Sequence, residues 1–251
     1  MNVLSLFSGI GGLDLGLERA EMTVVGQVEI DPWCRKVLAK HWPEVPRHDD
    51  VRTAVDWWRS ETRRPVHAVI GGFPCQPFSD AGLKRGVADE RWMWPAFADV
   101  IAGLRPRIVI VENVAALVRD GRAFGWLLAD LHRLGFDAEW SIVSACSLGA
   151  SHPRNRLFLV AYAHGAGLEG LHDALGPLNM RSTAGDLRRR WAPEPRVDRV
   201  ANGLPEQMDR LRGLGNAVVP QVAEHIGRMI MAAPATQTSG NPPGKESRGN
   251  L

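Results

Sequence analysis

The chain of 251 residues is long enough for one large α/β domain with a small appendage. Hydrophobic residues make up 45% of it and charged residues 23%, a balance that is typical of a globular protein and argues against a disordered one. No stretch reaches the roughly 18 apolar residues of a membrane-spanning helix, and residues 1–12 lack the basic region of a signal peptide. We therefore expect a cytoplasmic protein with no membrane partner.

Cysteine spacing and the type of basic residue narrow the function classes further. Cys34, Cys75 and Cys146 form neither a CxxC pair nor a metal-ligand pattern, so we expect a reduced protein with no metal. The net charge is only +2, but nearly all basic residues are arginines, which bind phosphates and guanine edges. A GC-rich coding bias would produce the same composition, so this feature alone does not indicate a nucleic-acid partner.

Short apolar strands alternate with helical segments through residue 162. The pattern predicts strands and helices in the chain order strand 3–7, helix from 13, strand 23–30, helix from 31, strand 66–70, helix 93–104, strand 107–111, helix 122–134, strand 137–145 and strand 156–162. Asp31-Pro32 is typical of a helix start, because Asp caps the helix and Pro suits its first position. This alternation predicts an α/β fold with a doubly wound parallel sheet.

The pattern changes after Tyr162. Residues 163–210 are rich in Gly, Pro and Arg, and they include Arg188, Arg189 and Arg190. Helical spacing returns after Gly215, and residues 232–251 have the polar, Pro- and Gly-rich composition of a disordered tail. We predict a main domain of residues 1–162 plus 211–231, a separate small region of 163–210, and a tail of 232–251.

Polar motifs lie at the carboxyl ends of four predicted strands, at 8–12, 29–31, 71–79 and 112–113. Ligands of doubly wound sheets bind outside the carboxyl ends of the strands, so these motifs predict one ligand site. The glycines of 8–12 allow a backbone to approach a ligand, and an acid such as Glu29 is placed to hold ribose hydroxyls. A plain turn and a solvated carboxylate are the structural alternatives.

Cys75 lies between Pro74 and Pro77, just after a buried strand. Prolines hold the backbone in a defined direction, and a thiol near a helix N-terminus or arginines can attack as a thiolate. The alternative is an inert, buried cysteine. Residues 80–92 read as a polar loop of the kind that closes over substrates.

Three further side chains are candidates for the same site. Glu112 follows an apolar strand, and burial there would raise its pKa and make it a general acid. Arg154 and Arg156 are two residues apart at the start of a strand and therefore point to the same side. A buried structural acid and a solvated charge pair remain the alternatives.

The identity and order of these segments resemble the cytosine-5 DNA methyltransferase family, and particularly its compact phage and prophage forms. The segments that carry the resemblance are LSLFSGIGGLDLGLE (4–18), VEIDPWC (28–34), HDDVR (48–52), GGFPCQPFS (71–79), ENV (112–114), HPRNRLF (152–158) and GLGNAVVP (213–220). The resemblance implies a Rossmann-like methyltransferase fold with a small target-recognition domain at 163–210. It also implies S-adenosylmethionine as cofactor, double-stranded DNA as partner and a monomer.

The resemblance further implies a role for each matching residue. Cys75 would be the nucleophile, Glu112 would contact cytosine N3 and its amino group, and Arg156 would contact the cytosine carbonyl with Arg154 in support. Phe7 and Ile30 would pack on adenine, Asp50 would bind its amino group, Glu29 would hold the ribose, and Asn216 would tie the last helix to the catalytic loop. The remaining predicted cofactor residues are Ser8, Gly9, Gly11, Gly12, Val51, Pro74 and Ala217, and the predicted DNA contacts are Gln76, Ser79, Arg188, Arg189 and Arg190.

Two departures and three alternatives qualify the resemblance. His152 stands where the family often has glutamine, and the region 163–210 is short for a recognition domain, which puts target specificity in question. A tRNA cytosine-5 methyltransferase usually carries Pro-Pro-Cys, whereas this chain has Phe73-Pro74-Cys75. A catalytically inactive DNA-binding relative is disfavoured by the intact motifs, and a NAD enzyme by Asp14, which replaces the third glycine of the dinucleotide motif. The sequence leaves open the target site and whether a cognate restriction endonuclease acts separately.

Overall fold

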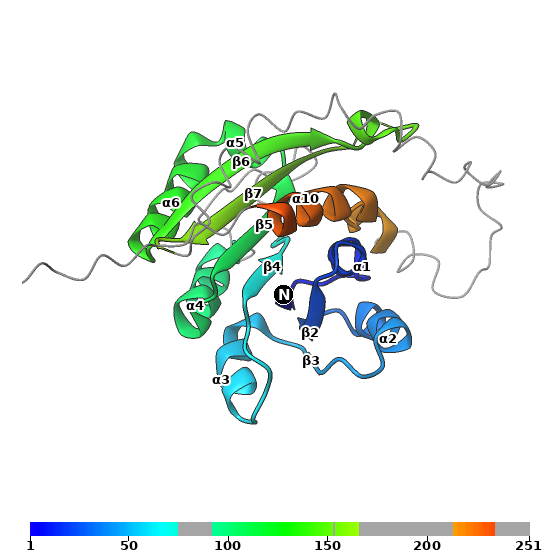
Figure 1. Ribbon diagram of the computed structural model, residues 1–251, viewed down its shortest axis with the longest axis vertical. Coiled ribbons are helices and arrows are strands. Elements are labelled where there is room, and N and C mark those ends of the chain that lie inside the picture. Colours follow the sequence, from blue (N-terminus) through cyan, green and yellow to red (C-terminus); the bar gives the residue numbers. More distant parts are fainter. Residues whose placement is uncertain (75–91, 153, 166–212, 234–251) are drawn as a thin grey trace, which may run out of the picture.

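The computed structural model describes residues 1–74, 92–152, 154–165 and 213–233. They form a seven-stranded sheet of order β3-β2-β1-β4-β5-β7-β6 with helices on both faces (Figure 1). Within these residues no helix is both long and apolar enough to cross a bilayer. The elements are β1 (Asn2–Leu6), α1 (Gly12–Arg19), β2 (Thr23–Val28), α2 (Pro32–His41), β3 (Arg47–His48), η1 (Val51–Thr53), α3 (Ala54–Arg59), β4 (Ala68–Gly71), α4 (Trp94–Leu104), β5 (Ile108–Val114), α5 (Ala116–Arg119), α6 (Gly121–Arg133), β6 (Phe136–Ser144), η3 (Ala145–Leu148), β7 (Asn155–Ala163) and α10 (Pro220–Ala232).

The central strands alternate their side chains between two hydrophobic cores. In β5, Val109 and Val111 face the core under α3, α4, α5 and α6, whereas Ile108 and Ile110 face the core under α1 and α10. Strands that are buried on both faces read as continuous apolar runs, and the RIVIV run of 107–111 is an example. The doubly wound α/β prediction is confirmed by this arrangement.

The prediction of an all-parallel sheet is wrong for the last two strands. Strands β3, β2, β1, β4 and β5 are parallel, but β7 runs antiparallel to both β5 and β6. Residues 145–154 connect β6 to β7, and the helix that the structure describes among them is the short η3. A parallel return needs a crossover of about a dozen or more residues, so the chain reverses into an antiparallel pair. The start of β7 therefore meets the carboxyl end of β5, where Val114 pairs with Arg156.

The last described helix, α10, packs against the first, α1. Helix α10 packs along α1 (Figure 1), and a Cβ added at Gly16 would lie 2.3 Å from the Pro220 carbonyl oxygen. A Cβ at Gly12 would lie 2.3 Å from the Val218 carbonyl oxygen. These glycines allow the segment before α10 to reach the edge of the sheet. Residues 213–233 are thus part of the same body as residues 1–74.

Most expected elements lie within a few residues of their predicted bounds, and Asp31 caps α2 by accepting hydrogen bonds from the backbone amides of Trp33 and Cys34. The short elements β3, η1, α3 and α5 were not predicted, because they are too short to show a hydrophobic period. Three predicted regions lie largely outside the described residues: the loop 80–92 except Trp92, the recognition region 163–210 except its first three residues, and the tail 232–251 except its first two residues.

Candidate active site

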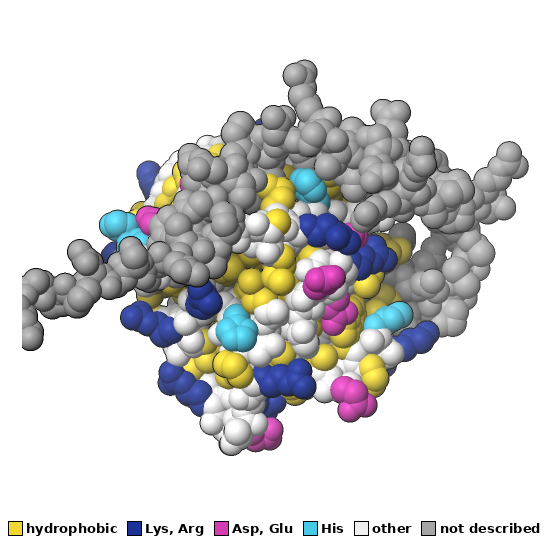
Figure 2. Space-filling view, in the orientation of Figure 1, with side chains coloured by type: hydrophobic (Ala, Val, Ile, Leu, Met, Phe, Trp, Pro, Cys, Tyr) yellow, Lys and Arg dark blue, Asp and Glu magenta, His cyan; other side chains and the backbone are white. Residues whose placement is uncertain are grey.

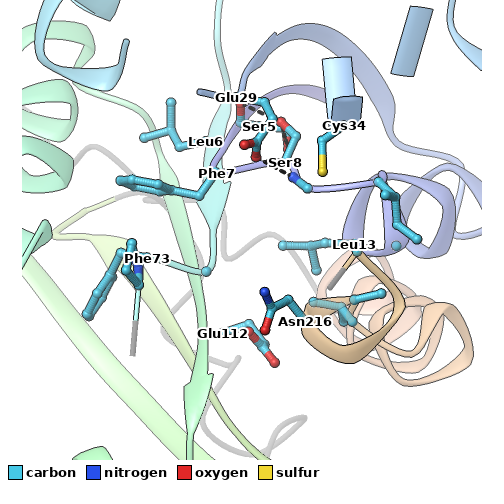
Figure 3. A pocket seen from close by; sticks show the side chains of 18 of the residues that line it. Ser5, Leu6, Phe7, Ser8, Leu13, Glu29, Cys34, Phe73, Glu112 and Asn216 are labelled. Carbon is cyan, nitrogen blue, oxygen red and sulfur yellow. Dashed lines mark hydrogen bonds between the residues drawn. The ribbon is translucent and has the colours of Figure 1, made fainter. Parts of the chain in front are cut away.

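A cavity of about 260 Å³ opens at the carboxyl ends of the central strands. Figure 3 shows Glu29, Ser5 and Ser8 on one side of it and Glu112 and Asn216 on the other. The described residues that line the cavity are Ser5, Leu6, Phe7, Ser8, Gly9, Ile10, Gly12, Leu13, Glu29, Ile30, Asp31, Cys34, Gly72, Phe73, Pro74, Glu112, Asn113, Val114, Arg156, Gly213, Asn216, Ala217 and Val218.

The loop after β1 turns sharply along one wall. Phe7, Gly9 and Gly11 have φ values of 52°, 55° and 84°, in the left-handed region that glycine adopts most easily. A Cβ at Gly11 would lie 2.4 Å from the Trp42 ring, so a side chain cannot be accommodated there. The Phe7 ring stacks on Phe97 with a centroid separation of 6.3 Å. Contacts with Phe97 at one end and Trp42 at the other therefore fix the loop after β1, which lines the cavity.

Glu29 joins the ends of β1 and β2. Its Oε2 accepts a hydrogen bond from the Gly9 amide at 2.7 Å, and its Oε1 accepts one from the Asp31 amide at 2.8 Å. Burial raises the pKa of Glu29, while these two backbone amides oppose the rise. Backbone amides stabilise the ionised form, so the carboxylate keeps lone pairs to offer hydroxyl groups in the cavity.

Glu112 lies near the end of β5 beside Arg156 of β7. Its Oε1 is 3.1 Å from Arg156 Nε, but the contact is not aligned as a hydrogen bond, and among the described residues this buried oxygen has no hydrogen-bond partner. Burial raises the pKa of Glu112 to about 7, although Arg156 and Arg154 oppose the rise. A carboxyl with this pKa is protonated in a large fraction of molecules at neutral pH and can donate a hydrogen bond.

Asn113 fixes the backbone that leads to the predicted nucleophile. Its side-chain amide donates to the Phe73 carbonyl oxygen at 3.1 Å, and its Oδ1 accepts from the Val114 amide at 2.9 Å. The Phe73 ring is 2% exposed and packs against Trp92 and Trp94. The segment that follows β4, up to Pro74, is thus anchored beside Glu112.

The structure brings most of the predicted site residues to one cavity. Among the predicted residues that line it are Phe7, Ser8, Gly9, Gly12, Glu29, Ile30, Pro74, Glu112, Arg156, Asn216 and Ala217. Cys75, Gln76, Ser79, Arg188, Arg189 and Arg190 lie outside the described residues.

Four predicted residues have other surroundings. Gly11 faces Trp42, and Val51 is buried in the core. The Asp50 carboxylate binds the Arg52 side chain and caps η1, and Arg52 lowers the pKa of Asp50 to about 2. Arg154 does not line the cavity; its Nη2 donates to the Gly215 carbonyl oxygen at 2.9 Å and so contacts the turn that carries Asn216.

Several lining residues had not been assigned a role from sequence, among them Ser5, Cys34, Gly72 and Asn113. Gly72 is informative, because a Cβ there would lie 2.8 Å from Glu112 Oε2. The Gly71-Gly72 pair and Asn113 belong to motifs visible in the sequence, but the contacts they make cross from one strand to another. Among the described residues, no three His, Cys, Asp or Glu side chains are grouped to hold a metal ion.

A comparison with known families finds one that matches most of the chain. The family described as C-5 cytosine-specific DNA methylase matches residues 1–188. The type II methyltransferase M.DsaV of Dactylococcopsis salina is 28% identical over 222 residues, which cover 86% of this chain and 62% of that protein. The type II methyltransferase M2.BsuMI of Bacillus subtilis is 34% identical over 170 residues, covering 64% and 42%. The chain thus spans less than two thirds of either relative.

Solved structures share the fold. A prophage-encoded E. coli protein described as a DNA modification methyltransferase superposes with a TM-score of 0.58 at 26% identity, covering 69% of this chain and 50% of that one. The S. pombe Dnmt2 methyltransferase superposes with a TM-score of 0.56 at 20% identity, covering 69% and 54%. At this identity the second likeness concerns the fold alone.

Proposed function

The chain belongs to the C-5 cytosine-specific DNA methylase family, and we propose that it transfers a methyl group from S-adenosylmethionine to carbon 5 of cytosine in double-stranded DNA. One observation carries the proposal. A single cavity joins Glu29, whose carboxylate is held by two backbone amides, to Glu112, whose carboxyl has a pKa of about 7. The first suits the ribose of a cofactor and the second suits a ring nitrogen of a base.

The lining residues fit S-adenosylmethionine. Ile30 is 68% exposed beside the cavity and offers an apolar surface to adenine, and Phe7 lines the cavity in the turn after the neighbouring strand β1. Glu29 would hold the ribose hydroxyls, and the backbone of residues 8–12 with that of Asn216 and Ala217 would surround the amino-acid end. When bound, the cofactor supplies an activated methyl group. Three predicted cofactor residues, Gly11, Asp50 and Val51, would support the cavity wall without contacting the cofactor. Gly11 faces Trp42, Asp50 binds Arg52, and Val51 packs in the core.

The proposed reaction needs a nucleophile and an acid. The Cys75 thiolate would add to carbon 6 of cytosine, which makes carbon 5 nucleophilic as negative charge develops toward N3 and the carbonyl oxygen. Protonated Glu112 would donate a hydrogen bond at N3, and the Arg156 guanidinium would bind the carbonyl oxygen. After methyl transfer, loss of the carbon 5 proton returns the electron pair that expels the Cys75 sulfur. The unsatisfied Glu112 Oε1 supports this role, since a bound base would supply its missing partner.

DNA binding is also a proposal. Carbon 5 of a paired base is reachable only after the base leaves the stack, which requires a few kcal/mol. Gln76, Ser79 and the Arg188–Arg190 cluster would contact DNA, with residues 163–210 as the target-recognition domain and residues 1–162 plus 211–231 as the catalytic domain. On the face that Figure 2 shows, basic and acidic side chains are interspersed, in keeping with the net charge of +2. The chain would act in the cytoplasm as a monomer.

The test is methyl transfer from labelled S-adenosylmethionine to duplex DNA and, in parallel, to tRNA. We expect label in duplex DNA with the wild type and none with Cys75→Ser. Cys146→Ser is the matched control, because Cys146 is exposed and does not line the cavity. Label in tRNA alone would favour the tRNA alternative, and full activity of Cys75→Ser would refute the covalent mechanism. Bisulfite sequencing of DNA from expressing cells would then identify the target site.

A further inference from the structure

A fully buried carboxylate lies directly behind the cavity wall. Asp14 is 0% exposed in the first turn of α1. Its Oδ2 accepts a hydrogen bond from Ser5 Oγ at 3.0 Å, and its Oδ1 accepts one from Gln27 Nε2 at 3.1 Å. The proposed reaction makes no use of this group. An ionisable side chain without solvent is costly to keep, so its position calls for a physical explanation.

Two serines connect Asp14 to the cavity. Ser8 Oγ donates to Ser5 Oγ at 2.9 Å, and both serines line the cavity. Gly12 and Leu13, which precede Asp14 in the chain, line it as well. The carboxylate is therefore separated from the cavity by a single hydroxyl. A charge at this depth acts on a ligand through protein, where the effective dielectric constant is lower than in water.

No cation of the described chain neutralises Asp14. Its hydrogen-bond partners Ser5 and Gln27 are uncharged, and the one charged side chain that influences it is another acid, Glu18. Burial raises the pKa of Asp14 to about 6, so the group is ionised in most molecules at pH 7.5. Its negative charge is consequently available to the cavity rather than cancelled in an ion pair.

The charged side chains of the cavity wall are also mostly negative, like Asp14. The charged residues that line the described part of the cavity are Glu29, Asp31, Glu112 and Arg156. With Glu112 protonated, as the proposed reaction requires, the two acids Glu29 and Asp31 still outnumber the one base, Arg156. A cavity of this character favours a cationic ligand. S-adenosylmethionine is positively charged at sulfur, whereas the product that has lost its methyl group is uncharged there.

We propose that Asp14 is a specificity-determining residue that makes the cavity prefer the charged methyl donor over its uncharged demethylated product. This inference rests on the proposed function, because it assumes that S-adenosylmethionine occupies the cavity. Such a preference favours release of product after each transfer. The contribution is electrostatic and acts through the protein, so it requires the charge of Asp14 but no contact with the cofactor.

Asp14→Asn removes the charge and keeps the shape. The introduced amide can be satisfied, because Gln27 Oε1 is buried with no hydrogen-bond partner among the described residues and can accept from that amide if the Gln27 side chain turns over. Calorimetric titration would measure the dissociation constants of S-adenosylmethionine and S-adenosylhomocysteine. We expect the ratio of the two affinities to shift against the charged ligand by about three- to tenfold, with the affinity for S-adenosylhomocysteine nearly unchanged. The control is Glu21→Gln, which removes an exposed charge just beyond the same helix.

A swapped pair separates charge from structure. Asp14→Asn combined with Gln27→Glu returns one carboxylate to the same hydrogen-bonded pair, so we expect it to restore most of the preference. Equal weakening of both ligands in Asp14→Asn, or no change in either, would overturn the inference. If Asp14→Asn does not fold, Asp14→Ser replaces it, because a hydroxyl can still pair with Ser5. A wild type that binds neither ligand would refute the proposed function itself, whereas binding with an unaltered ratio in the variants would refute only the role of Asp14.

Discussion

Two buried carboxyl groups, Glu29 and Glu112, stand on different sides of one cavity and differ in their partners (Figure 3). Both are desolvated, and in both burial is the main cause of a raised pKa. Each oxygen of Glu29 accepts a hydrogen bond from a backbone amide, whereas Glu112 has an imperfectly aligned ion pair with Arg156. Two glutamates thus differ in role: Glu29 is a fixed hydrogen-bond acceptor, and Glu112 is a candidate proton donor.

The difference follows from the strands that carry the two residues. Glu29 directly follows β2, which lies between the parallel strands β1 and β3, and the loops after β1 and β2 turn their amides toward it. Glu112 lies in β5, whose neighbour β7 runs in the opposite direction and brings arginine side chains to the same edge. Parallel neighbours therefore supply backbone donors to the cavity, and the antiparallel neighbour supplies charged side chains.

The largest expected effect is on the rate. Glu112→Gln keeps the shape of the side chain but cannot supply an acidic proton, and we expect kcat to fall by about 10²–10³-fold. The affinity for S-adenosylmethionine should stay within about threefold, because Glu112 would act on the base. Single-turnover transfer and equilibrium binding would measure the two effects. The exposed residue Glu44 offers the matched control Glu44→Gln, and a variant that loses affinity but retains its rate would contradict the division of roles.

Glu29→Gln should have the opposite profile. One amide oxygen can replace one carboxylate oxygen, but the new NH₂ group would face the backbone N–H of Gly9 or Asp31. We expect the dissociation constant of S-adenosylmethionine to rise by about 10–50-fold, equivalent to about 1.4–2.3 kcal/mol. At saturating cofactor, kcat should change little. A strong loss of kcat at saturation would show that Glu29 also acts in the chemical step.

Phe7→Ala tests the apolar contribution to the Glu29 side of the cavity. The Phe7 ring stacks on Phe97, and Phe7 lines the cavity. We expect cofactor affinity to fall about three- to tenfold from lost aromatic contact. Trp126→Ala is the control, because Trp126 is 50% exposed on α6 and does not line the cavity. An unchanged dissociation constant, with folding confirmed by circular dichroism, would remove Phe7 from the cofactor site.

The last expected effect is on stability rather than on the rate or on cofactor affinity. Burial raises the pKa of Glu112 from 4.5 to about 7, so the folded chain binds this proton more tightly than the unfolded chain. The resulting stabilisation is complete below pH 4.5 and is lost as pH rises through 7. Between pH 5 and 8 we expect Glu112 to account for a loss of about 2–3 kcal/mol in the free energy of unfolding. Urea titrations of the wild type and Glu112→Gln would measure it, and parallel pH curves for the two would contradict a raised pKa.

The sequence by itself determined the α/β class, the position of the strand ends and the residues that gather there. Local physics sufficed for these features: apolar runs buried on both faces, a capping aspartate before proline, and glycines where the chain turns. Glu29 and Glu112 were predictable as site residues because each directly follows or ends a buried strand, and strand ends of a doubly wound sheet share one edge.

Only the tertiary structure decided how these groups are partnered. The reversal of β7, the bond from Asn113 to the Phe73 carbonyl, and the bond from Arg154 to the Gly215 carbonyl join residues that are 40 or more positions apart or depend on strand direction. Asp14 shows the same limit, because a missing glycine in a motif became a buried carboxylate only when β1 and β2 placed Ser5 and Gln27 beside it. Burial and hydrogen bonding set the charge state of a carboxyl group, and both arise from packing between elements rather than from the order of residues within one.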